Sequence, residues 1–220
     1  MQRLKVGVGV LVFVGLVCGR AAAQDVPEEA RKMLAQNLGG PCLVFLDKVQ
    51  ADLKLTNEQK EKVEKHLQEL FPDAMQFFQK LQDLKGEERE KEHKAYQKKV
   101  GEKLTAVLKE TLKEEQLKRV RQLELQQVGA VVLLNGDDES GKDLKITDEQ
   151  RKQFMAVIQD LQKKVAPLIK EAQSGGNHEE IRSKVMKIKK EHLDQIVALL
   201  TDAQKKQWQE MLGKTLDLDE

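Results

Sequence analysis

The sequence predicts an all-α protein made of elongated helical hairpins arranged as two pseudo-repeat units. The body of the chain is rich in Ala, Leu, Glu, Lys and Gln, which are good helix formers. Apolar residues recur at steps of three and four, which is the spacing of one face of a helix. A short motif also occurs four times, as LTNEQKEKV, LKEEQLKRV, ITDEQRKQF and LTDAQKKQW, beginning at Leu55, Leu112, Ile146 and Leu200.

Residues 1–23 predict a secretory signal peptide. Arg3 and Lys5 give a positively charged start, an apolar stretch follows, and a small-residue pattern ends at Ala23, so cleavage is expected before Gln24. The apolar stretch is shorter than the ~20 residues that span a bilayer, and no later stretch is long and apolar enough. We therefore expect a periplasmic or secreted chain with no membrane span after cleavage.

Residues 24–52 form an N-terminal lead segment with a short apolar run, PCLVFL. Cys42 in this run is the only cysteine left after cleavage, so no intramolecular disulfide can form. Cys42 is interpreted as a small buried hydrophobe rather than as a reactive thiol, and whether it forms an intermolecular disulfide stays open.

Residues 53–128 are predicted to form the first helical unit. A helix with one apolar stripe follows Thr56, and a charge-dense helix over 86–112 is expected to pack through one narrow face. With Thr56 as the N-cap, Gln59 is the third helical residue, which predicts a capping box. Four residues beyond each motif glutamine stands an apolar residue that is expected to anchor the helix in the core. These anchors are Val63, Val120, Phe154 and Trp208.

Residues 129–145 are predicted to be a linker with an apolar run and an acidic loop, and residues 146–220 the second helical unit. In that unit SGGN at 174–177 separates two helices. Lys113 stands where the third motif copy would have its capping threonine, so the sequence leaves open whether a separate helix starts there. The helix-capping positions are Leu55, Thr56, Gln59, Leu112, Gln116, Ile146, Thr147, Gln150, Leu200, Thr201 and Gln204.

The motifs LTNEQ, LKEEQ, ITDEQ and LTDAQ in an exported helical chain resemble the Spy/CpxP group of LTxxQ periplasmic stress proteins. The resemblance covers roughly residues 53–212. It implies a cradle-shaped helical protein that holds unfolding clients without ATP, with two tandem units in one chain here. Members of that group use a basic and apolar concave face, whereas removal of Arg3, Lys5 and Arg20 leaves 35 basic against 37 acidic residues in this chain.

The charge balance and the low aromatic content argue against nucleic-acid binding. Two neighbouring phenylalanines widen the apolar stripe of the first helix, which makes this stripe the candidate client contact. The alternative is that the same residues belong to the core. The candidate residues are Phe71, Met75, Phe77 and Phe78.

No catalytic motif, cofactor motif or metal-ligand spacing is present, so the sequence predicts a protein that is not an enzyme. The four histidines stand at positions 66, 93, 178 and 192 without a partner ligand at helical spacing. The expected function is that of an ATP-independent chaperone or envelope-stress accessory protein, whose partners are unfolded proteins or an envelope protein. The alternatives are a metal-responsive sensor or buffer, and a structural or assembly protein that self-associates.

Overall fold

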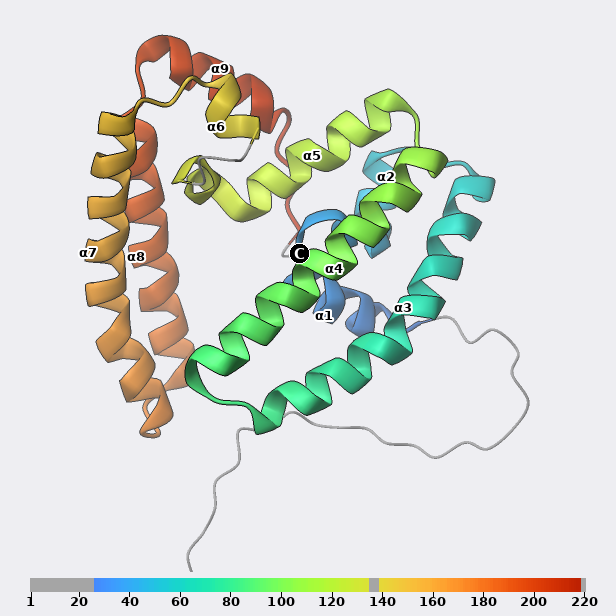
Figure 1. The fold of residues 1–220 in the computed structure, drawn as a ribbon, viewed down its shortest axis with the longest axis horizontal. Helices are drawn as coiled ribbons and strands as arrows, with labels where there is room; N and C mark the ends of the chain where they lie inside the picture. Colours follow the sequence, from blue (N-terminus) through green and yellow to red (C-terminus); the bar gives the residue numbers. More distant parts are fainter. Residues whose placement is uncertain (1–25, 135–138, 219–220) are drawn as a thin grey trace, which may run out of the picture.

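The computed structural model describes residues 26–134 and 139–218, and every regular element within these ranges is a helix (Figure 1). The predicted all-α fold class is therefore confirmed. The predicted signal peptide lies outside the described residues, as do residues 135–138 of the predicted acidic loop. Among the helices of the described ranges, none combines the length and the apolar character that crossing a membrane requires.

The elements follow one another in two similar series. The first series is α1 (Glu28–Leu38), the 3-10 helix η1 (Gly40–Phe45), α2 (Asp47–Asp52), α3 (Asn57–Asp83), α4 (Gly86–Thr111) and α5 (Glu114–Val128). The second is the 3-10 helix η2 (Gly129–Leu134), α6 (Glu139–Asp143), α7 (Asp148–Gln173), α8 (His178–Ala198) and α9 (Asp202–Leu212). Each series contains a 3-10 helix, a short helix, a long hairpin and a last helix. The interpretation as a sequence repeat stays a prediction.

Two long antiparallel hairpins dominate the molecule, α3 with α4 and α7 with α8 (Figure 1). Pro72 lies inside α3, and α3 bends visibly along its length, as expected where a proline removes one hydrogen bond of the helix. The α7–α8 hairpin turns at the predicted SGGN segment, where the Asn177 side chain accepts hydrogen bonds from the backbone N–H groups of Glu179 and Glu180. That contact is an ordinary N-cap for α8.

The apolar run of the lead segment forms the centre of the first core. Its residues Cys42, Leu43, Val44 and Phe45 make up most of η1 and are all buried, packed among α1, α3, α4 and α5. Burial, with a smaller contribution from the Glu124 carboxylate, raises the pKa of the Cys42 thiol to about 12. Cys42 is thus buried, as the sequence predicts.

A second apolar cluster forms from η2, α7, α8 and α9, and α5 joins the two clusters. Val120 and Leu123 of α5 belong to the first cluster, whereas Leu125 belongs to the second. In the predicted linker, residues 129–134 form η2 and residues 139–143 form α6, with Ser140 buried. α5 therefore connects the two clusters, and the second hairpin contacts it through η2 and α9.

Candidate functional site: paired glutamines and an exposed hairpin face

The four motif glutamines form two pairs, each of which closes the base of one hairpin. Gln59 at the start of α3 donates to Gln116 Oε1 at 2.8 Å, and Gln116 at the start of α5 donates back to Gln59 Oε1 at 3.2 Å. Gln150 of α7 and Gln204 of α9 repeat this exchange at 2.7 and 3.1 Å. We call these pairs the glutamine clasps.

In each clasp the side-chain amides use both their donors and their acceptor. Gln59 Oε1 also accepts from the Thr56 backbone N–H at 3.0 Å, and Gln59 Nε2 also donates to the Thr111 carbonyl at 3.0 Å. Gln116 Nε2 likewise reaches the Leu53 carbonyl, at 3.0 Å. In the second clasp Gln150 Nε2 donates to the Leu199 carbonyl and Gln204 Nε2 donates to the Leu144 carbonyl. A clasp therefore joins the start of the first hairpin helix, the end of the second and the start of the next helix.

The capping boxes lie where the motif predicts them. The hydroxyls of Thr56, Thr147 and Thr201 accept hydrogen bonds from the backbone N–H groups of their motif glutamines, at 3.3, 3.2 and 3.3 Å. The third motif copy does start a separate helix, α5, at Glu114. There only the glutamine half of the box forms, from the Lys113 backbone N–H to Gln116 Oε1, because a lysine side chain has no acceptor.

Replacing Thr56 or Thr147 with alanine should lower the free energy of unfolding by about 1 kcal/mol, because each loses an N-cap acceptor. Urea titration followed by far-UV circular dichroism measures the change. Thr105 is exposed inside α4, so Thr105→Ala is a matched control that should be neutral or slightly stabilising. An unchanged midpoint in both cap variants would contradict the capping role.

The apolar residues four positions beyond the motif glutamines are core residues, as predicted. Val63 and Val120 lie in the first cluster, and Phe154 and Trp208 in the second, all of them buried. The motif thus sets a helix start, a clasp and a core contact within one short segment.

The predicted client contact on α3 lies mostly against the first core. Phe71, Phe77 and Phe78 are half-buried and pack on that cluster, and Met75 is half-buried. The Phe77 ring stacks on the Tyr96 ring of α4, with centroids 3.8 Å apart and planes 8° apart. Burial and the neighbouring Asp73 carboxylate raise the pKa of Tyr96, whose hydroxyl donates to Asp73 at 3.1 Å.

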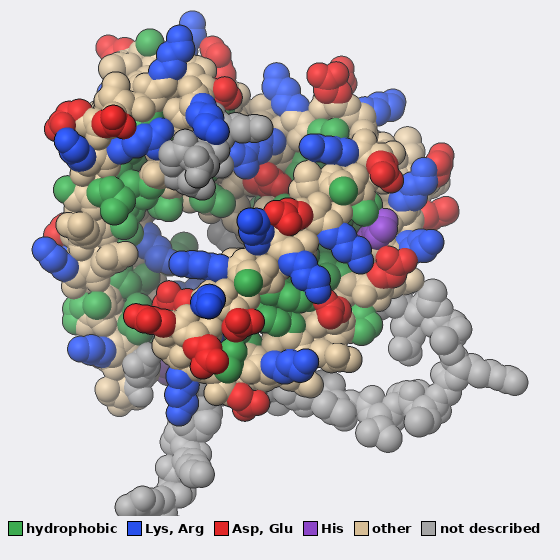
Figure 2. Space-filling view, viewed as in Figure 1, with side chains coloured by type: hydrophobic (Ala, Val, Ile, Leu, Met, Phe, Trp, Pro, Cys, Tyr) green, Lys and Arg blue, Asp and Glu red, His purple; other side chains and the backbone are tan. Residues whose placement is uncertain are grey.

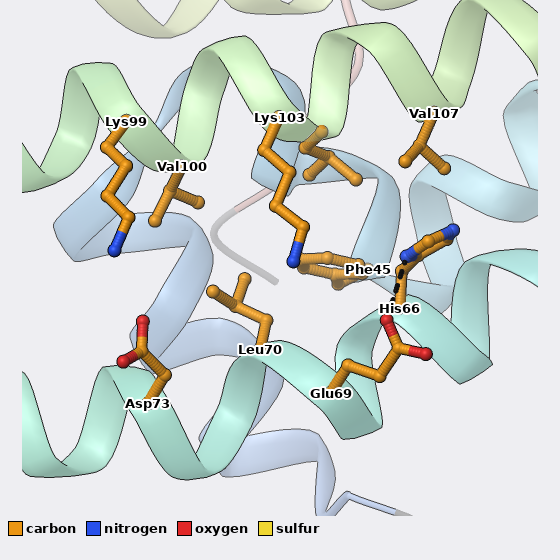
Figure 3. A pocket seen from close by; sticks show the side chains of 10 residues that line it. Phe45, His66, Glu69, Leu70, Asp73, Lys99, Val100, Lys103 and Val107 are labelled. Carbon is orange, nitrogen blue, oxygen red and sulfur yellow. Dashed lines mark ion pairs between the residues drawn. The ribbon is translucent and has the colours of Figure 1, made fainter.

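A cavity of about 290 Å³ lies between α3 and α4, with Phe45 of η1 at its back (Figure 3). Leu70 and Val107 give it apolar walls, while Lys99 extends from α4 toward Asp73 on α3 (Figure 3). The ten described residues that line it include no serine, threonine or cysteine. The cavity can accept an apolar side chain or a small amphipathic molecule, and its lining offers no hydroxyl or thiol nucleophile.

The large apolar side chains that are most exposed lie elsewhere, beyond the first hairpin. They are Val128, Val131, Met155, Ile169 and Met186, with exposed fractions of 46, 38, 49, 49 and 56%. Residues of α7 and α8 thus include three apolar side chains that no neighbouring element covers fully. We call the surface formed by Met155, Ile169 and Met186 the hairpin face.

Helix geometry places these three residues on one side of the hairpin. Each follows directly after an apolar residue that is buried or half-buried, since Phe154, Leu168 and Val185 precede Met155, Ile169 and Met186. The buried stripes of two antiparallel helices face each other. The residue one step of 100° after a stripe position therefore points to the same side of the pair in both helices. The sequence does not identify this face, because amphipathic periodicity does not show which side of a stripe a neighbour covers.

A buried histidine links α8 to α7 within this hairpin. His192 Nδ1 lies 2.7 Å from the Ile188 carbonyl, and His192 Nε2 lies 3.0 Å from Asp160 Oδ2. A carbonyl and a carboxylate only accept hydrogen bonds, so both contacts form when both ring nitrogens carry protons. Lys164 also contacts Asp160 Oδ2, at 2.7 Å. Its hydrogen bond, followed by that of His192, lowers the pKa of Asp160.

Replacing Asp160 with asparagine should destabilise the protein near neutral pH and much less in acid. Because the folded state lowers the pKa of Asp160, the carboxylate stabilises the fold above the ordinary aspartate pKa. That contribution is lost as the pH falls through the lowered value. Urea unfolding of both proteins at about pH 7 and about pH 3 measures the difference. A difference that is equal at both pH values would contradict the role of the charge.

The molecule is hollowed beside this hairpin. Figure 2 shows the hollow between the α7–α8 hairpin and α4, with hydrophobic side chains on the hairpin side and basic ones opposite. A groove of about 810 Å³ opens between α8 and the first half, lined by Arg182 and Met186 of α8 and by Leu43 and Leu46 in and beside η1. The C-terminal residues 215–218 also line it. Its wall combines apolar side chains with cations.

Within the described ranges, no group of three or more His, Cys, Asp and Glu residues is placed to hold a metal ion. His66 pairs with Glu69 at 3.4 Å, and His192 is engaged as described above. In the described ranges this all-α protein therefore presents a cavity and a groove that are lined by both apolar and charged side chains. Comparison with protein-family models, curated proteins and solved structures found no match to this chain.

Proposed function

We propose that this chain is an exported, ATP-independent binding module. In this role it acts as a periplasmic chaperone or envelope-stress accessory protein that holds unfolded or partly folded proteins. The observation that carries the proposal is that three large apolar side chains of one hairpin, Met155, Ile169 and Met186, are each about half exposed. Exposed apolar surface beside a hollow is what a protein that binds unfolded segments needs.

The chemistry of the hairpin face suits varied partners. Two of its three residues are methionines, whose flexible and polarisable side chains adapt to different apolar surfaces. Exposed lysine and glutamate residues of the same two helices keep the hairpin soluble between binding events. The motif resemblance to Spy/CpxP proteins supports the same role, and the predicted signal peptide supports export.

The test is suppression of aggregation by the chain from Gln24 onward, without nucleotide. A chemically denatured client enzyme is diluted into buffer at two salt concentrations, and light scattering is recorded. We expect suppression at a low molar excess, with little salt dependence because the contact is apolar. Absence of suppression by a protein that is helical by circular dichroism would refute the proposal.

Two pairs of substitutions locate the binding surface. Ile169→Ser/Met186→Ser should reduce suppression strongly, whereas Phe77→Ser/Phe78→Ser should mainly lower stability, because those rings pack on the core. The matched control is Gln153→Ser/Lys187→Ser. Both residues are exposed, and each directly precedes a residue of the buried stripe, so both lie on the side of the hairpin opposite to the hairpin face. Equal loss in the control pair would place binding elsewhere. Self-association without suppression would favour the assembly alternative.

A further inference from the structure

The C-terminal residues leave the second half and lie against the first. After α9 the chain turns at Gly213, where φ is 61° and ψ is −158°, a conformation that only glycine adopts readily. A Cβ atom at Gly213 would clash with the Gln122 side chain of α5. Beyond the turn, Leu216 and Leu218 pack against the first apolar cluster. We call residues 213–218 the tail.

One side chain of α5 holds the tail through its backbone. Gln126 Nε2 donates to the carbonyls of Leu212 and Lys214, at 2.6 and 2.9 Å. Gln126 Oε1 accepts from the Leu216 backbone N–H at 3.1 Å. The Lys214 and Leu216 contacts use only the backbone of the tail, so Gln126 can make both with any extended segment that offers a carbonyl and, two residues later, an N–H.

The groove around Gln126 is chemically complementary to the side chains of the tail. In Thr-Leu-Asp-Leu one acidic residue, Asp217, stands between two leucines, so the leucines face the core while Asp217 is exposed. Lys32 of α1 and Arg182 of α8 supply cations along the same groove. The leucines are only half-buried, and the groove stays open beside the tail. A second segment can therefore enter before the tail leaves.

We propose that this groove is a binding site for extended peptide segments in which leucines alternate with acidic residues, and that the tail is its resident occupant. A partner segment displaces the tail, takes its hydrogen bonds to Gln126 and buries its own leucines on the first cluster. The inference rests on the proposed function in one respect, namely that the partner segment belongs to an unfolding protein.

The test uses the chain from Gln24 to its C-terminus and a fluorescein-labelled peptide, GKTLDLDE, read by fluorescence anisotropy. The wild-type chain should bind the peptide weakly, because its own tail competes. Leu216→Ser/Leu218→Ser in the chain should raise the affinity about tenfold or more. Adding Gln126→Ala to that variant should remove most of the gain, whereas adding Lys118→Ala, a change elsewhere on α5, should not.

A second variant controls for a folding defect in the first. Gly213→Ala should dislodge the turn without changing either leucine, because alanine rarely adopts φ 61° with ψ −158°, and it should also raise peptide affinity in a protein of normal helicity. A peptide with both leucines replaced by serine should not bind. Failure of both folded tail variants to bind GKTLDLDE, or indifference to Gln126→Ala, would overturn the inference.

The peptide and aggregation assays separate the two proposals. Aggregation suppression without peptide binding overturns the groove and leaves the binding-module function standing. Peptide binding without suppression supports the groove and refutes the chaperone role.

Discussion

Phe154→Ala should lower the free energy of unfolding of the second half by about 3–5 kcal/mol. Phe154 is fully buried in the second cluster, four residues beyond the motif glutamine Gln150, and alanine leaves a cavity that rigid neighbouring helices cannot fill. Trp208 is buried in the same cluster and is the chain's only tryptophan, so its fluorescence during urea titration reports this unfolding directly.

The adjacent residue provides the control. Met155 is 49% exposed on the hairpin face, so Met155→Ala should change the free energy of unfolding by at most about 0.5 kcal/mol. The two substitutions differ by one step along α7, yet they test the core and the proposed binding surface separately. A large loss for Met155→Ala would show that the hairpin face is covered in solution.

Gln59→Ala should lower the free energy of unfolding by about 2–3 kcal/mol. The side chain is nearly buried. Its removal takes one hydrogen bond from the Thr111 carbonyl and two from the Gln116 amide, which keeps its bonds to Lys113 and Leu53. Gln116→Ala should have an effect of similar size. Gln76 is exposed on α3, so Gln76→Ala should cost a few tenths of a kcal/mol at most and serves as the control.

The double variant distinguishes a clasp from two separate caps. If the amides act as a pair, Gln59→Ala/Gln116→Ala should cost clearly less than the two single losses together, with a coupling of about 1 kcal/mol or more. Urea titration followed by circular dichroism measures all three variants. Strict additivity would mean that each glutamine only caps its own helix.

The helix starts are predictable because capping is local. Thr56 and Gln59 lie three residues apart, so the sequence alone contains both halves of the interaction. The pairing of Gln59 with Gln116 crosses 57 positions, and the capping pattern does not predict it. One signal is present: the third motif copy lacks its threonine but retains Gln116, which indicates a role for the glutamine beyond the capping box.

The binding surfaces are less predictable, for a physical reason. The wide stripe around Phe77 suggests an uncovered surface, but Tyr96 of α4 and the first cluster take up that width. The stripes of α7 and α8 also contain adjacent apolar residues, such as Leu168 and Ile169, but few elements cover them, so Ile169 and Met186 stay exposed. Which stripe is covered depends on the packing of distant segments, and helical periodicity carries no information about it.

Both clasps lie at the bases of the hairpins, so the far ends take no part in closing them. The turn at Gly86 is open, because a Cβ atom added there would meet no other atom within 4 Å, and Gly175 is equally open. The length of a hairpin can therefore change without altering the contacts at its base. Seven residues added to each arm would extend a hairpin by about 10 Å while its base, its caps and its core anchors kept their register. The reach of the molecule can thus change without redesign of what holds it together.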